Sequence, residues 1–169
     1  MRLFGYILVV SALFLSVLVS SALAGNAHFV KNLSSASLSG QNLVCAFKEA
    51  GLQSGATETV TCSANESISY ECVNGGTKNP SASNKRTFNT SNAASGQFTA
   101  DQNGNITGTL TITPKSAASL GFSCPPGQTV TLVSVTYSNV QLIDGTSGAS
   151  LSLPGTFTFT NPNAPTPAS

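Results

Sequence analysis

Apolar and polar residues alternate with a period of two along much of this chain. Between Ile106 and Ile112, the apolar residues Ile106, Leu110 and Ile112 fall on one face and three threonines fall on the other. This alternation is typical of a half-buried β-strand. The same pattern predicts strands at residues 43–47, 57–63, 67–73, 96–100 and 155–160. Because strand patterns recur and helical periodicity does not, the sequence predicts an all-β protein.

The longest strand-like run, Gln128–Asp144, changes its alternation twice. Its apolar residues first occupy even positions, then odd positions from Val133 to Tyr137, and then even positions again from Val140. Because one extra residue shifts a strand's alternation by one, the two slips predict β-bulges, or a short turn near Ser138 and Asn139. The sequence from Asp144 to Gly148 predicts a hairpin turn.

Gly and Asn clusters divide the chain into short segments at intervals of roughly 8–14 residues, a spacing that favours a β-sandwich or barrel. We expect a two-sheet antiparallel sandwich of the immunoglobulin-like type, with a small β-barrel as the alternative. One such domain accounts for residues 25–160. Residues 161–169 are rich in Pro and uncharged, which predicts a flexible tail.

Residues 1–24 have the pattern of a secretory signal peptide. Arg2 precedes an apolar run from Leu3 to Val19, and small residues then lead to Ala24. The pattern predicts cleavage after Ala24 and a secreted, extracellular protein that begins at Gly25. An uncleaved anchor is the alternative, although the run is short for a membrane-spanning helix.

The remaining chain is almost free of charge. Charged residues make up 8% of the whole sequence, against roughly 25% in average soluble proteins. Without Arg2, six Lys and Arg residues balance six Asp and Glu residues, so the net charge of residues 25–169 is zero. The lack of a basic excess argues against nucleic-acid binding and, after cleavage, against membrane binding. Ser and Thr together number 44.

No convincing catalytic arrangement is present. His28 is the only histidine, and we read it as a polar residue at the head of a first strand, Ala27–Lys31. It is a weak metal candidate, because a mature chain starting at Asn26 or at His28 could chelate copper. A hydrolytic triad would need His28 with Asp101 or Asp144, and no spacing singles out a carboxylate pair of the glycosidase type. We therefore predict no catalytic residue, cofactor or metal.

One polar stretch, Asn74–Arg86, is a candidate surface loop. It contains Asn74, Lys78, Asn84, Lys85 and Arg86, and its three cations are half of those in residues 25–169. Long loops on β-scaffolds often carry function. The alternative is an ordinary solvated connection.

Several segments together resemble a family of small secreted proteins of filamentous actinobacteria and related soil bacteria. They occur in this order: Ala27-His-Phe-Val-Lys31, Phe47-Lys-Glu-Ala-Gly-Leu52, Tyr70-Glu-Cys-Val-Asn-Gly-Gly76, Asn84-Lys85, Phe122-Ser-Cys-Pro-Pro-Gly-Gln128 and Val135-Thr-Tyr-Ser-Asn-Val140. The resemblance implies export and a compact domain and no particular activity. It also implies that Cys72 and Cys124 are the usual cysteines of the family and that Cys45 and Cys62 are an additional pair.

Four cysteines in an exported domain predict two disulfides. We expect the pairs Cys45–Cys62 and Cys72–Cys124. If the strands around Cys45 and Cys62 formed an antiparallel hairpin about residues 52–55, these two residues would be directly opposed. The second bridge would tie the middle of the chain to its last third.

These observations favour a secreted, non-enzymatic extracellular domain that binds a polar surface, a partner or a small ligand. Low charge and abundant Ser, Thr and Asn suit hydrogen bonding to cell-wall material or another polysaccharide surface, and we expect any site on the Asn74–Arg86 loop. The alternative is a secreted hydrolase or copper-binding enzyme.

Overall fold

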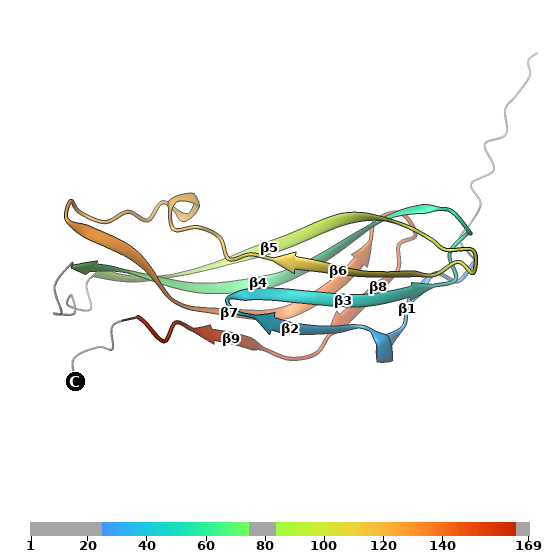
Figure 1. Ribbon diagram of the computed structural model, residues 1–169, viewed down its shortest axis with the longest axis horizontal. Coiled ribbons are helices and arrows are strands. Elements are labelled where there is room, and N and C mark those ends of the chain that lie inside the picture. Colours follow the sequence, from blue (N-terminus) through green and yellow to red (C-terminus); the bar gives the residue numbers. More distant parts are fainter. Residues whose placement is uncertain (1–24, 75–83, 165–169) are drawn as a thin grey trace, which may run out of the picture.

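A computed structural model describes residues 25–74 and 84–164, so the predicted signal peptide and the end of the predicted tail lie outside the described residues. Each strand pairing in this part of the chain is antiparallel, as the all-β prediction requires (Figure 1). The strands are β1 (His28–Phe29), β2 (Ser35–Ser39), β3 (Asn42–Ala50), β4 (Thr57–Asn74), β5 (Lys85–Thr99), β6 (Ile106–Ile112), β7 (Gln128–Asp144), β8 (Ser150–Leu153) and β9 (Phe157–Thr160). Two short 3-10 helices are η1 (Lys31–Leu33) and η3 (Ala118–Leu120).

The smaller sheet is centred on β3. One edge of β3 pairs with β6, and the other edge pairs with β2 and then β1. The larger sheet is centred on β4, which lies between β5 and β7, and the outer edge of β7 pairs with β9 and β8. The two sheets do not close on each other, so the predicted sandwich is confirmed and the alternative barrel is wrong.

The larger sheet extends well beyond the smaller one, because β4 has 18 residues and β6 has 7. The connection from β6 to β7, residues 113–127, covers part of this extension (Figure 1). Phe122 stacks on Tyr70 with ring centroids 6.2 Å apart, and the Tyr70 hydroxyl donates to the Lys115 carbonyl at 2.7 Å. This connection therefore acts as a cover where the second sheet of the sandwich is missing.

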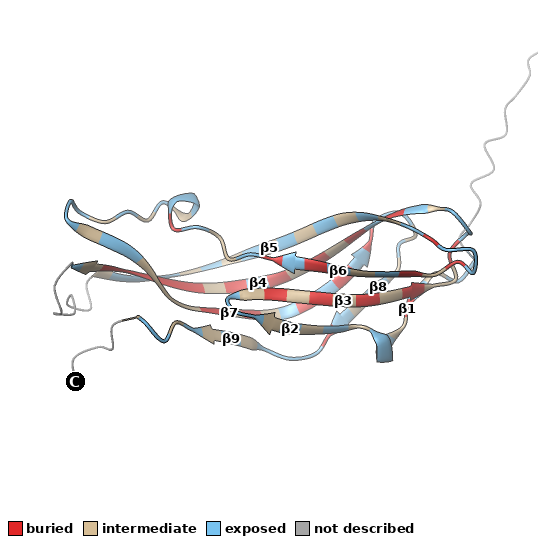
Figure 2. Ribbon diagram, viewed as in Figure 1, coloured by how far each residue is buried: buried red, intermediate tan, exposed pale blue. Residues whose placement is uncertain are grey.

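Buried residues concentrate on the facing sides of β3, β4 and β6 (Figure 2). The core includes Phe47, Ile68 and Tyr137, and the Tyr137 hydroxyl donates to the Gln41 carbonyl at 3.0 Å. Both tyrosines of the domain are therefore buried with bonded hydroxyls and do not line an open site.

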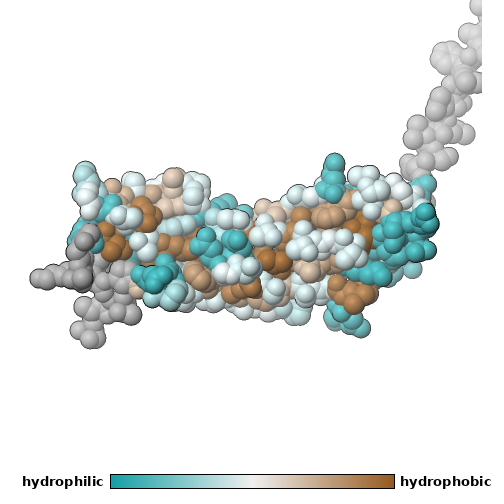
Figure 3. Space-filling model, viewed as in Figure 1, coloured by the Kyte–Doolittle hydropathy of each residue, from teal (hydrophilic) through white to brown (hydrophobic). Residues whose placement is uncertain are grey.

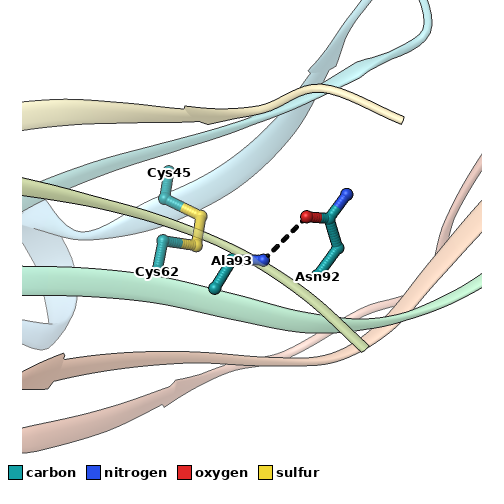
Figure 4. Close-up of a disulfide and its surroundings, with 4 residues drawn as sticks. All are labelled: Cys45, Cys62, Asn92 and Ala93. Carbon is teal, nitrogen blue, oxygen red and sulfur yellow. Dashed lines mark hydrogen bonds between the residues drawn. A yellow bond between two sulfur atoms is a disulfide. The ribbon is translucent and has the colours of Figure 1, made fainter. Parts of the chain in front are cut away.

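Both predicted disulfides are present, Cys45–Cys62 and Cys72–Cys124. The hairpin from which the first pair was predicted is wrong, because β3 and β4 belong to different sheets and do not pair. Cys45 and Cys62 instead meet across the interior and link the two sheets covalently (Figure 4).

The phase slips in β7 are confirmed as irregularities against β4. Between Ser69 and Tyr70 of β4 one extra residue, Val133, is accommodated in β7, and a second shift follows opposite Ser63 and Asn65. Asn139 lies in this second bulge with a left-handed φ of 52°. The predicted hairpin turn after Asp144 is also confirmed, since β7 and β8 pair directly across it.

Candidate functional site

One polar surface dominates the outer side of the larger sheet. From Thr57 to Ser67, odd-numbered residues of β4 are exposed or half-buried on this side, as are their register partners on β5 and β7; Ser69 continues the row but is only 7% exposed. We call this surface the hydroxyl face, because most of its side chains carry hydroxyl groups. Its central residues are Thr57, Thr59, Thr61, Ser63, Asn65, Ser67 and Ser69 on β4, Thr87, Asn89, Ser91, Ala93, Ser95, Gln97 and Thr99 on β5, and Ser134, Thr136, Ser138, Gln141 and Ile143 on β7.

Cross-strand hydrogen bonds fix several hydroxyls of this face. Thr61 Oγ1 and Ser95 Oγ are 2.8 Å apart, Ser69 Oγ and Thr87 Oγ1 are 2.6 Å apart, and Thr136 Oγ1 lies 3.0 Å from Thr158 Oγ1 on β9. Each hydroxyl can donate once and accept twice. The hydroxyl face therefore presents ordered groups that keep capacity for an external partner.

The hydroxyl face carries no charged or aromatic side chain among the central residues that define it. Glu71 and Lys85, which are register partners, lie just beyond one end of it. The other side of the molecule, with β2, β3 and β6 toward the viewer, mixes apolar and polar residues, and hydrophilic residues gather where the β3–β4 and β5–β6 connections lie (Figure 3). The larger sheet thus offers the more uniform neutral surface.

The second bulge of β7 hollows the hydroxyl face. One hollow of about 410 Å³ lies beside Asn65, Asn89 and Ser138, and a second of about 360 Å³ lies beside Asn65, Asn139 and Gln141. A third of about 310 Å³ extends from Asn139 and Gln141 to Pro154 and Gly155. Because neighbouring hollows share lining residues, we treat them as one groove, the bulge groove, across β5, β4, β7 and the end of β8.

A second cluster lies at one end of the sandwich interior. Glu49 of β3, Glu58 of β4 and Asp144 of β7 come from both sheets and are 0%, 3% and 0% exposed. Ser147 in the β7–β8 turn donates to Glu49 Oε1 at 3.1 Å, and the Thr146 N–H donates to Asp144 Oδ1 at 2.8 Å. One oxygen of each of the three carboxyl groups has no partner among the described residues unless the carboxyl groups share a proton with one another. This arrangement suits carboxyl groups that share protons.

The three carboxyl groups titrate differently. Burial and then the charge of Asp144 raise the pKa of Glu49 to about 7, and the same two causes raise the pKa of Glu58. Burial alone would raise the pKa of Asp144, but hydrogen bonds from Ser147, Thr146 and Glu58 together hold it below its ordinary value. Asp144 is thus the ionised member, and Glu49 is protonated in mildly acidic solution.

A raised and a lowered carboxyl pKa side by side is the pattern of an acid and a nucleophile in glycosidases. Here, however, the burial of all three carboxyl groups keeps a polymer away from them. Sequence reasoning did not single out this cluster, because Asp144 is 86 residues beyond Glu58 in the chain and no spacing links the three groups. The available signal was that each of the three acidic residues occupies a buried position in the alternating pattern of its strand.

The sequence candidates for catalysis are not brought together. His28 is exposed, and its Nδ1 lies 2.8 Å from the Asn26 carbonyl oxygen. Asp101 accepts hydrogen bonds from the backbone N–H groups of Asn103 and Asn105 in its own turn. Within residues 25–74 and 84–164, no group of three or more His, Cys, Asp or Glu residues has a geometry that could hold a metal ion.

The predicted surface loop is shorter than expected at both ends. Asn74 is the last residue of β4, and Lys85 and Arg86 are the first two residues of β5 rather than loop residues. The guanidinium carbon of Arg86 lies 4.7 Å from the centre of the Phe88 ring, which holds it on the strand. Asn84 directly precedes β5, and Lys78 lies outside the described residues. A ligand site on this connection stays a prediction.

In the part of the chain that the structure describes, no helix has the length and apolar character needed to cross a membrane. Comparison with models of known protein families, with curated proteins and with solved structures gave no match.

Proposed function

We propose that this chain is a secreted, non-enzymatic module that attaches to neutral, hydroxyl-rich polymers, such as cell-wall polysaccharide, through the hydroxyl face. The observation that carries this proposal is the size and uniformity of that face, which spans three strands without a charged or aromatic side chain among its central residues. Neutral hydroxyl and amide groups bind polar polymers by hydrogen bonds, directly or through water.

The proposed place of action is the cell exterior. The N-terminal sequence pattern and the two disulfides support export, because disulfides persist in oxidising compartments. The covalent link between two antiparallel sheets also supports the immunoglobulin-like type of sandwich. Export, cleavage after Ala24 and kinship with the actinobacterial secreted proteins belong to the same proposal.

A co-sedimentation experiment tests the proposed function. The protein from Gly25 onward is mixed with insoluble cellulose, chitin or purified bacterial cell walls, and the bound fraction is measured. Thr59→Lys combined with Gln97→Lys places two cations on facing positions of the hydroxyl face. We expect this variant to bind at least about tenfold more weakly, because a desolvated charge without a partner opposes contact.

The matched control is Ser37→Lys combined with Thr109→Lys, two exposed positions on the outer side of the smaller sheet. This variant should bind like the unaltered protein. Equal losses in both variants would point to a general charge effect, and no binding of the unaltered protein to any of the three materials would overturn the proposed function.

A further inference from the structure

The bulge groove is a distinct feature within the hydroxyl face. From Ser63 to Asn65, β4 advances by two residues while β7 advances by three, from Gln141 back to Ser138. The extra residue places Asn139 in the left-handed region, which Asn adopts more readily than most other non-glycine residues. Bulges of this kind are common next to functional sites, where they redirect a side chain.

The chemistry of the groove is that of side-chain amides. Asn65, Asn89, Asn139 and Gln141 line it from three strands and are exposed. Within residues 25–74 and 84–164, none of these four amides makes an internal side-chain hydrogen bond, unlike Asn92, Asn105 and Asn161. Each free amide offers two donors and one acceptor oxygen, which suits the adjacent hydroxyl groups of a sugar.

The charge of the groove also restricts its ligand. Among the described residues that line the three hollows, the only ionisable one is Glu66, which is 1% exposed. Its Oε1 accepts hydrogen bonds from the Asn92 side chain and the Lys115 N–H, so it is turned inward. The groove therefore offers no exposed cation to an acidic sugar and no exposed anion to an amino sugar or a basic peptide.

One end of the groove supplies apolar contact. Val140, Leu153, Pro154 and Gly155 are among its lining residues there. Because Val140 and Leu153 are only 1% and 4% exposed, the exposed ring of Pro154 is the apolar group that can replace the aromatic side chains on which sugar rings usually stack. The hollows cross four neighbouring strands, which at strand spacings near 4.8 Å is roughly 14 Å, the scale of a short oligosaccharide.

We propose that the bulge groove binds a single chain of a neutral, polyhydroxylated glycan that lies across the strands. The amides of Asn65, Asn139 and Gln141 would contact its hydroxyl groups, and Pro154 would contact a ring face. This inference rests on the proposed function and deepens it, because it assigns the recognition of one chain to one part of the hydroxyl face.

The test uses soluble probes in place of insoluble material. Binding of neutral cello-oligosaccharides, neutral chito-oligosaccharides and acidic oligogalacturonates is measured by isothermal titration calorimetry. We expect binding of one or both neutral series and at least about tenfold weaker binding of the acidic series. Stronger binding of the acidic series, or no binding of any series, would overturn the groove assignment.

Two variants examine the groove itself. Asn65→Ala combined with Gln141→Ala removes two amides, and Asn139→Gly removes a third while retaining a residue that adopts a positive φ readily. Each should weaken the binding of the neutral probe at least about tenfold. The matched control, Gln53→Ala combined with Gln102→Ala, removes two exposed amides outside the hydroxyl face and should bind normally.

The results separate the groove from the hydroxyl face as a whole. If the unaltered protein still binds the insoluble material and the Thr59→Lys/Gln97→Lys variant still binds it at least about tenfold more weakly, the proposed function stands. Unchanged binding of soluble and insoluble glycans by all folded groove variants would then overturn the groove assignment alone. Circular dichroism and thermal unfolding establish that each variant is folded.

Discussion

Cys45 and Cys62 face each other from opposite sheets, with Cα atoms 6.4 Å apart and both side chains fully buried. Cys72 and Cys124 instead attach the 113–127 cover to the end of β4, with Cα atoms 5.5 Å apart. The first bridge therefore fastens the two layers of the sandwich, and the second closes the cover over the extension of the larger sheet.

We expect both bridges to contribute strongly to stability. Loop-closure entropy predicts about 3 kcal/mol for the 17-residue separation of Cys45 and Cys62 and about 4 kcal/mol for the 52-residue separation of Cys72 and Cys124. Urea unfolding of the two double Cys→Ala variants measures these losses. A loss below about 1 kcal/mol for either variant would contradict the prediction.

Stability should fall as the pH rises from 5 to 8.5. The folded pKa of Glu49, about 7, lies above its ordinary value of 4.5, so its contribution is complete below the ordinary value and disappears as the pH rises through 7. At about 1.4 kcal/mol per pKa unit, the loss is about 3 kcal/mol. The free energy of unfolding, measured by urea titration at each pH, tests this.

The Glu49→Gln variant isolates the group responsible, because it cannot ionise and keeps an oxygen for Ser147. Its stability should vary less between pH 5 and 8.5. The control is Asp101→Asn, since hydrogen bonds from Asn105 and Asn103 lower the pKa of Asp101 and its titration falls below this range. A Glu49→Gln profile as steep as that of the unaltered protein would show that another group dominates.

Gly108 should tolerate no side chain. A Cβ atom at this position would lie 2.5 Å from Phe98 Cε1 and 2.7 Å from Phe47 Cζ, and these two rings pack edge to face with centroids 5.1 Å apart. Gly108→Ala should cost about 1–3 kcal/mol in chemical denaturation. Gly145→Ala is the control, because its new Cβ would meet only the Thr59 carbonyl oxygen, at 3.8 Å.

Tyr70→Phe should loosen the 113–127 cover, because it removes the hydrogen bond to the Lys115 carbonyl. The expected loss is about 1 kcal/mol, and hydrogen–deuterium exchange should rise within residues 113–124. Tyr137→Phe is the counterpart, since the Tyr137 hydroxyl bonds to the Gln41 carbonyl between β2 and β3 and not to the cover. If hydrogen–deuterium exchange in the cover rose by the same amount in the Tyr70→Phe and Tyr137→Phe variants, Tyr70 would have no specific role in holding the cover.

The alternation of residues predicted the strands well where both faces differ in polarity, as in β6 and β7. It divided β4 into two predicted strands, 57–63 and 67–73, because Ala64, Asn65 and Glu66 interrupt the apolar alternation, although Glu66 is buried. It also missed β2 and most of β5, where Ser, Ala and Asn occupy both faces and give no contrast. The bulge groove was partly visible as the phase slip near Asn139, whereas its amides could be grouped only once the register of four strands was known.

The position of the Cys45–Cys62 bridge has a mechanical consequence. The described chain enters the sandwich beside β1 and leaves it beyond β9 at the opposite end (Figure 1), and β1 and β9 belong to different sheets. Tension between these ends pulls the sheets in shear, and the bridge transfers that load to a covalent bond rather than to side-chain contacts. Force spectroscopy should therefore show a high rupture force that drops when a reductant opens the bridge, and an unchanged force would contradict this load path. A domain held between a surface and a cell would thus keep its layers together under drag.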